Sequence, residues 1–144
     1  GFGVLDGRRR KLTLGKGGGP YPRWIRGGVT TELQISGIPL GLFPESEYEE
    51  ITVDLVPGDV LVFASDGILE AEDSEKEEFG AERLHALLSE VKADETALTV
   101  ADRILFATDA YTGVDQTPHD DRTLIVLRVT DENGADFSKL PIIY

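Results

Sequence analysis

A short apolar run that ends on an acidic turn constrains this chain more than any other stretch. Residues 60–64 read Val-Leu-Val-Phe-Ala, and Ser65-Asp66-Gly67 follows directly. A run of branched and aromatic residues of this length predicts a buried strand, and glycine permits a sharp turn after it. Asp66 is therefore expected at a strand end, where rigid folds present chemical groups. From these residues alone, a turn aspartate that caps its own loop explains the pattern equally well.

A second buried strand, predicted over residues 124–129, begins shortly after the acid pair Asp120-Asp121. If the two strands are antiparallel neighbours, the end of the first lies beside the start of the second. Asp66 then converges with both acids at one sheet edge. Three carboxylates without cysteine form a hard oxygen site, which suits Mg²⁺ or Mn²⁺, or else Ca²⁺, rather than zinc. Like charges this close repel one another unless a cation is present.

Strand patterns fill the first half of the chain. Alternating or apolar runs predict a hairpin and three further strands, over residues 1–16, 21–26, 29–35 and 48–55. Pro57 and Gly58 occupy the second and third positions of a type II turn. Because this turn connects them directly, we expect strand 48–55 to be the antiparallel neighbour of strand 60–65.

Helical patterns follow in the second half. Residues 80–91 carry apolar side chains at helical spacing, and a second helix is expected from Asp94, as its N-cap, to residues 107–112. The acidic stretch 70–78 is interpreted as a solvated loop. His85 lies beside the apolar stripe of the first helix and is interpreted as a partly buried structural residue rather than a ligand. Helices segregated from antiparallel strands predict an α+β fold.

Composition narrows the possible functions. A length of 144 residues predicts one domain, and a formal net charge of −13 argues against a nucleic-acid partner, which requires a basic face. The absence of cysteine excludes disulfides, thiolate metal sites and a cysteine nucleophile, and fits a cytoplasmic protein. No apolar run is long enough to insert into a membrane.

Taken in order, several segments resemble the metal-dependent serine/threonine protein phosphatases of the PPM type. The bacterial SpoIIE-like branch, which regulates sporulation and stress sigma factors, is the most similar. Residues 57–71 resemble its Pro-Gly-Asp, hydrophobic strand, Thr-Asp-Gly signature. Weaker motifs of the same branch match in the same order at residues 3–6, 38–41, 79–84 and 120–124. The resemblance covers residues 1–130 as the C-terminal part of the domain, and leaves residues 131–144 as a tail.

The resemblance implies an antiparallel β-sandwich flanked by helices, with two Mn²⁺ or Mg²⁺ ions at its edge. A metal-activated water would attack the phosphorus of phosphoserine or phosphothreonine. By position, Asp66 and Asp120 match metal ligands of the family. Asp121 matches an adjoining position that more often supports the ligands, and Gly67 lies next to the site through its backbone. The implied substrate is a phosphorylated regulatory protein of the anti-sigma-factor-antagonist type.

Two departures from the family pattern qualify this reading. The N-terminal segment that supplies the bridging carboxylate has no counterpart here, and the frequent Ala-Gly-His reads Gly17-Gly18-Gly19. We therefore expect an incomplete domain with little or no activity by itself, which self-associates through an uncovered sheet. The alternative is a catalytically inactive phosphatase-like module that binds a regulatory protein. A third interpretation is an unrelated, acidic, β-rich binding domain.

Overall fold

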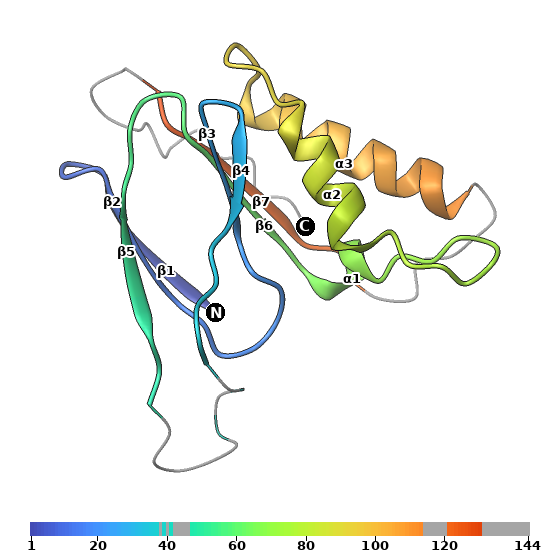
Figure 1. Cartoon of the computed structure of the whole chain (residues 1–144), viewed down its shortest axis with the longest axis horizontal. Helices are drawn as coiled ribbons and strands as arrows, with labels where there is room; N and C mark the ends of the chain where they lie inside the picture. The colour runs from blue at the N-terminus through green and yellow to red at the C-terminus, as the bar shows by residue number, and fades with distance from the viewer. Residues whose placement is uncertain (38, 40, 42–46, 114–120, 131–144) are drawn as a thin grey trace.

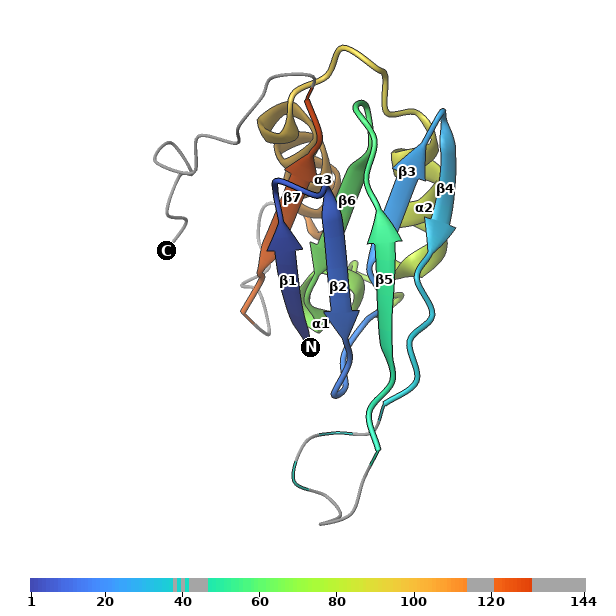
Figure 2. The same ribbon diagram turned by 90° about the vertical axis from the view of Figure 1, so that its left-hand side faces the viewer.

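Two antiparallel sheets pack face to face, and two helices cover the outer face of one of them (Figures 1 and 2). This computed structural model describes residues 1–37, 39, 41, 47–113 and 121–130. The three-stranded sheet has the order β1-β2-β5, with bounds Phe2–Asp6, Lys11–Gly15 and Glu50–Asp54. The four-stranded sheet has the order β4-β3-β6-β7, with bounds Val29–Glu32, Arg23–Arg26, Val60–Ala64 and Leu124–Arg128. The predicted α+β sandwich is confirmed.

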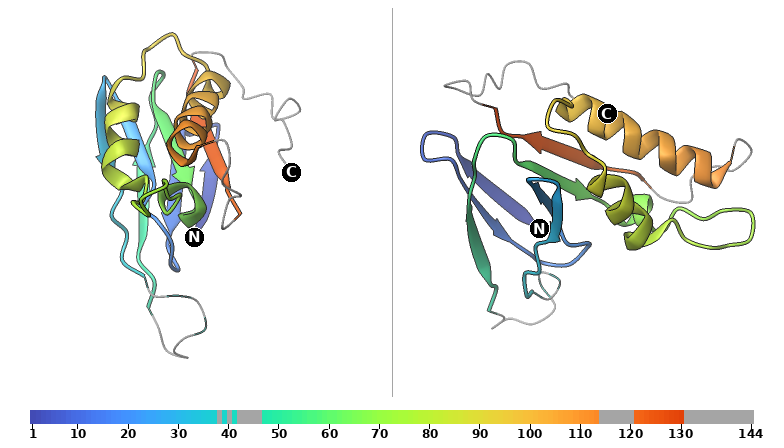
Figure 3. Two further views of the ribbon diagram at one scale, coloured as in Figure 1. Left: turned by 90° about the vertical axis from the view of Figure 1, so that its right-hand side faces the viewer. Right: turned by 45° about the horizontal axis from the view of Figure 1, so that its top comes forward.

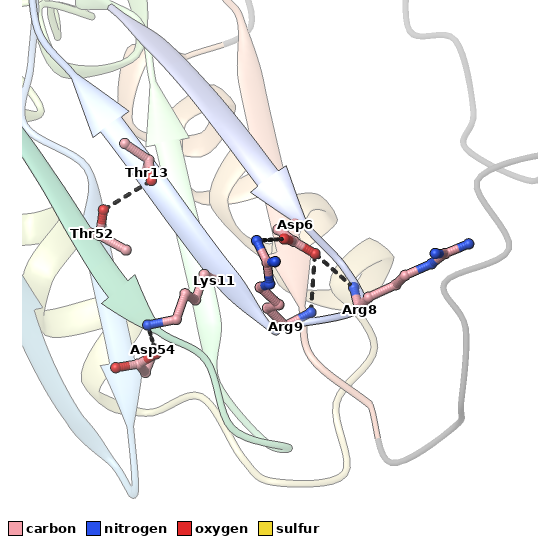
Figure 4. Close-up of polar contacts among 7 residues, drawn as sticks. All are labelled: Asp6, Arg8, Arg9, Lys11, Thr13, Thr52 and Asp54. Atoms are coloured by element: carbon pink, nitrogen blue, oxygen red, sulfur yellow. Dashed lines mark hydrogen bonds and ion pairs between the residues drawn. The ribbon is translucent and has the colours of Figure 1, made fainter.

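The predicted N-terminal hairpin is also confirmed. β1 and β2 pair in register from Phe2 opposite Gly15 to Asp6 opposite Lys11. Asp6 Oδ1 accepts hydrogen bonds from the backbone N–H groups of Arg8, at 3.1 Å, and Arg9, at 3.0 Å (Figure 4). A side chain that satisfies these turn amides favours a tight reversal at this point.

The outer face of the three-stranded sheet is partly polar and partly apolar. The Thr13 and Thr52 hydroxyls lie 2.9 Å apart, and Lys11 Nζ lies 2.8 Å from Asp54 Oδ1, so both pairs link β2 to β5 (Figure 4). On the same face of β1, the exposed fractions of Phe2 and Val4 are 51% and 61%. No helix among the described residues covers this face (Figure 2). Self-association through it stays a prediction.

The expected pairing of strand 48–55 with strand 60–65 is wrong. β5 pairs with β2 in one sheet, whereas β6 lies between β3 and β7 in the other. Gly58 does have the positive φ, +95°, that a type II turn requires. The turn therefore forms as predicted, but it carries the chain across the core from one sheet to the other (Figure 1). The reason is burial: β6 is apolar on both faces and belongs in the middle layer.

The core has two layers, and β6 contributes to both. Between the sheets lie Leu12, Leu14, Leu33, Ile35, Leu55 and Leu61. Between the four-stranded sheet and the helices lie Ile25, Val60, Val62, Ile68, Phe79, Leu84, Leu88, Val100 and Ile104. Because successive side chains of a strand point to opposite faces, Leu61 serves the first layer and its two neighbours serve the second.

Three helices follow β6: α1 (Asp66–Leu69), α2 (Gly80–Ser89) and α3 (Ala97–Thr112). The short α1 was not expected from the sequence. α3 begins after Thr96, whose Oγ1 accepts a hydrogen bond from Thr99 N at 3.1 Å, so the prediction of Asp94 as N-cap is wrong. His85 is exposed on α2 rather than partly buried. No helix in the described part of the chain is long and apolar enough to cross a membrane.

Candidate metal centre

The candidate site lies where β6 ends and β7 begins. These strands are antiparallel neighbours, which is the condition set for convergence of the acids, and Ala64 lies opposite Leu124 at the last paired position. The chain therefore leaves β6 beside the point where it enters β7, and α1 lies at this edge (Figures 1 and 3). Asp66 follows the end of β6 and Asp121 precedes the start of β7, so both acids belong to adjacent strand ends. Asp120, the other predicted ligand, lies outside the described residues.

Asp66 is exposed as the first residue of α1. Its carbonyl accepts a hydrogen bond from Glu70 N at 2.8 Å, which closes the single helical turn. The two residues after it, Gly67 and Ile68, are buried. Burial of these neighbours fixes the turn against the core, while the carboxylate stays in water. Gly67 has no side chain and adds only its backbone to this edge. Asp121 is also exposed.

Ser65 joins the two strand ends through several hydrogen bonds. Its backbone N–H donates to Thr123 O at 2.9 Å. Its hydroxyl accepts from Thr123 N at 2.9 Å and donates to Asp121 O at 3.3 Å. In the sequence, Ser65 is visible only as part of the acidic turn that follows a buried strand. The signal that was overlooked is a hydroxyl between a buried strand and its acidic turn.

An ion pair adds a second link to this edge. Arg122 Nη1 lies 2.6 Å from Asp109 Oδ1, which joins the residues before β7 to the last turns of α3. The Arg122 side chain is 24% exposed and that of Asp109 is 60% exposed. At such exposure the pair contributes at most about 1 kcal/mol to stability. Its main effect is to direct the Arg122 side chain toward α3.

Hydrogen bonds to backbone groups organise the acidic loop between α1 and α2. Asp73 Oδ1 accepts hydrogen bonds from Glu75 N at 2.8 Å and Glu77 N at 3.0 Å. These backbone donors, that of Glu77 first, hold the pKa of Asp73 below its ordinary value. Tyr111 Oη donates to the carbonyl oxygens of Glu77, at 3.2 Å, and Glu78, at 3.3 Å. Asp73 therefore acts as a turn acceptor in this loop.

The described residues fit part of a divalent-cation site. Asp66 and Asp121 offer carboxylate oxygens, the ligand type that Mg²⁺ and Mn²⁺ prefer. Among the residues that the structure describes, no three His, Asp or Glu side chains form a group that could hold a metal ion. Two carboxylates leave most positions of an octahedral ion to water or to other groups, so these residues alone would bind one ion weakly.

Among the residues that the structure describes, the most buried acid lies at the other end of β6. Asp59 is 1% exposed and precedes the strand directly. Its Oδ1 accepts from Arg26 Nε at 2.8 Å, and its Oδ2 accepts from Arg26 Nη2 at 2.6 Å and from Val56 N at 2.9 Å. The sequence interpretation treated Asp59 only as part of a motif. Its partner lies 33 residues away in the chain, on β3, so no local pattern revealed the pair.

Comparison with known proteins identifies relatives of this arrangement. The family described as stage II sporulation protein E (SpoIIE) matches residues 1–130. The manganese-presoaked phosphatase domain of the cell fate determinant SpoIIE from Bacillus subtilis superposes with a TM-score of 0.70 and 19% identity, over 93% of this chain and 57% of that one. The SiaA-PP2C domain of Pseudomonas aeruginosa gives a TM-score of 0.66 and 22% identity, over 84% and 47% of the two chains.

A structure with the RsbU and RsbW domains of a Mycobacterium tuberculosis protein gives a TM-score of 0.62 at 19% identity, over 92% of this chain and 36% of that one. A search of curated proteins finds no match to the sequence. The chain spans little more than half of the SpoIIE phosphatase domain, at 57% of its length. At these identities the solved structures establish the fold, and the family match establishes descent. The chain therefore belongs to the SpoIIE family, and its described part has the fold of a PP2C-type phosphatase domain.

Proposed function

We propose that the domain to which this chain belongs hydrolyses phosphoserine or phosphothreonine on a regulatory protein, with Mn²⁺ or Mg²⁺ as cofactor. In this proposal Asp66 and Asp120 are metal ligands and Asp121 supports them. The observation that carries the proposal is the antiparallel pairing of β6 with β7, because it brings the two acidic strand ends to one edge. Membership of the SpoIIE family supports the same reaction class.

The chemistry divides between the cofactor and the chain. When bound, the ions supply an activated water nucleophile and neutralise charge on the phosphoryl oxygens. Asp66 contributes a hydrated carboxylate at a fixed strand end, so it can bind a cation without leaving a buried partner unpaired. Ile68, buried under the turn, keeps that carboxylate from moving with a flexible loop. Asp121 would act from the neighbouring strand.

The substrate is proposed to be a phosphorylated regulatory protein of the anti-sigma-factor-antagonist type. Support comes from the similar SpoIIE phosphatase domain, which is described as part of a cell fate determinant. The formal net charge of −13 agrees with a protein partner rather than a nucleic acid. The same negative charge would repel an acidic substrate protein, so binding of such a substrate would require compensating local contacts or cations.

A second candidate function is a catalytically inactive module that binds such a regulator. The observation that favours it is the shortage of ligands: no three potential metal-binding side chains gather among the described residues. The two candidates make different demands on Asp66. A metal-dependent enzyme requires its charge, whereas a binding module of the same fold does not.

The test compares Mn²⁺ binding by the 144-residue chain and by two isosteric variants. Asp66→Asn removes a charge at the strand end, and Asp102→Asn removes one from an exposed position on α3. We expect weak Mn²⁺ binding by calorimetry or electron paramagnetic resonance, lost in Asp66→Asn and retained in Asp102→Asn. We also expect little or no turnover of a phosphopeptide by this chain. Unchanged Mn²⁺ binding in Asp66→Asn would reject the proposed ligand.

A further inference from the structure

Ser65 occupies the N-cap position of α1 but does not cap it. Its backbone is extended, with φ −78° and ψ 168°, and its side chain makes no hydrogen bond to the helix. A serine at this position ordinarily accepts a hydrogen bond from an amide of the first helical turn. Here the hydroxyl turns toward the neighbouring strand instead. This unusual choice of partner indicates a role in the β6–β7 junction.

The junction explains why a hydroxyl is needed there. In a regular antiparallel pair, two opposed residues exchange both backbone hydrogen bonds. Ser65 N donates to Thr123 O as the pattern requires, but Ser65 O accepts from Ile68 N at 3.1 Å to begin α1. Thr123 N therefore loses its carbonyl partner, and Ser65 Oγ takes that place at 2.9 Å. The hydroxyl lets the strand pairing continue for one more residue while the backbone already turns into the helix.

The same hydroxyl extends this pairing toward the second acid. Ser65 Oγ donates to Asp121 O at 3.3 Å, so one side chain contacts two residues of the segment that enters β7. Ser65 is itself half-buried, which limits competition from water for these bonds. Asp66 is the next residue along the chain. The contacts of Ser65 therefore set the separation between the segment that bears Asp66 and the segment that bears Asp121.

We propose that Ser65 is a positioning residue, which holds the Asp121 segment against the end of β6 so that acids from both strand ends can share a cation. This proposal rests on the proposed metal-dependent function. In this proposal Ser65 contacts neither the substrate nor the cation. Loss of the hydroxyl removes its hydrogen bonds with Thr123 N and Asp121 O together, and the segment that enters β7 separates from Asp66.

The experiment uses the 144-residue chain with Ser65→Ala, Ser65→Thr and a matched control. In the control, Ser89→Ala, the deleted hydroxyl donates to His85 O at 2.9 Å on the exposed side of α2. Two signals are recorded by nuclear magnetic resonance: amide hydrogen exchange at Thr123, and broadening of the Asp66 and Asp121 amides as Mn²⁺ is added. The first reports the junction and the second reports the cation site.

We expect Ser65→Ala to raise exchange at Thr123 about fivefold or more, since one net hydrogen bond is lost. Half-maximal broadening should require several-fold more Mn²⁺. Ser65→Thr should restore both signals, and Ser89→Ala should change neither. Unaltered Mn²⁺ titration in Ser65→Ala, with or without faster exchange, would overturn the positioning role alone. If Mn²⁺ does not broaden the Asp66 and Asp121 amides of the unsubstituted chain, the proposed metal site is overturned and the positioning role with it. This holds even if Ser65→Ala still raises amide exchange at Thr123.

Discussion

Replacing Asp59 by asparagine tests how β6 is held at its start. The buried carboxylate receives hydrogen bonds from three donors: Arg26 Nε on one oxygen, and Arg26 Nη2 and Val56 N on the other. Asparagine has the same shape but only one acceptor oxygen. In either orientation its amide nitrogen therefore faces at least one of these donors, in a site from which water is excluded.

The expected cost follows from this count. In the better orientation, the asparagine oxygen still accepts from Arg26 Nη2 and Val56 N, and only the charge-assisted hydrogen bond from Arg26 Nε is lost. Such a bond contributes about 1.5–3 kcal/mol. We therefore expect Asp59→Asn to lower the free energy of unfolding by about 2–3 kcal/mol. At roughly 2–4 °C per kcal/mol for a chain of this size, the melting temperature should fall by roughly 4–12 °C.

The pH dependence gives the prediction a second test. Burial alone raises the pKa of Asp59, but the Arg26 hydrogen bonds, the Val56 N–H and the Arg26 charge together hold it below 3.8. A carboxyl with a lowered folded-state pKa stabilises the fold above its unfolded pKa, and this stabilisation disappears as the pH falls through the folded value. The difference between the two proteins should therefore be constant from pH 5 to 7 and shrink below about pH 3.8.

Urea denaturation followed by circular dichroism, repeated across this pH range, supplies the measurement. Asp54→Asn is the matched control, because its ion pair with Lys11 is 2.8 Å long but its side chain is 76% exposed. We expect the control to change stability by less than about 0.5 kcal/mol. Equal effects of the two substitutions, or a difference that does not shrink as the pH falls below about 3.8, would refute the reasoning.

Two further predictions concern packing and backbone conformation. Ile104→Ala should lower the free energy of unfolding, measured by urea denaturation, by about 2–5 kcal/mol, because the side chain is 0% exposed. The control Phe106→Ala, on the same helix but 76% exposed, should change it by less than about 0.5 kcal/mol. Similar values for the two variants would mean that α3 packs through another face. Gly58→Ala should cost about 1 kcal/mol or more in thermal unfolding, since its φ is +95°, and an unchanged melting temperature would argue against the type II turn.

Local pattern predicted the strands well and their neighbours less well. The sequence leaves the antiparallel pairing of β7 with β6 as the condition under which the acids converge, and the structure has that pairing. β5 was placed beside β6 because a type II turn joins them, and this was wrong. Turn chemistry fixes a few dihedral angles, but it does not decide which sheet the next strand joins. Burial decides that: β5 alternates exposed and half-buried residues, whereas β6 begins with three buried ones.

In the candidate site, too, local features can be predicted from the sequence, whereas contacts between distant segments cannot. The positions of Asp66 and Asp121 at strand ends follow directly from the sequence, and their metal-binding role stays a prediction. Ser65 was missed because its partner Thr123 is 58 residues away, and the need for a hydroxyl arises only when the Ser65 carbonyl turns into α1. A role that depends on the loss of one backbone hydrogen bond can be inferred only once the pairing register is known.

The two acids at the ends of β6 have opposite relations to the fold. Asp59 is buried and its charge is matched by Arg26, so removing that charge should destabilise the chain. Asp66 is exposed, so water can solvate its charge in the folded chain. Asp66→Asn should therefore leave the free energy of unfolding within about 0.5 kcal/mol of the original value. If urea denaturation confirms this, loss of Mn²⁺ binding in Asp66→Asn reports a lost ligand; a large destabilisation would instead show that the acid serves the fold.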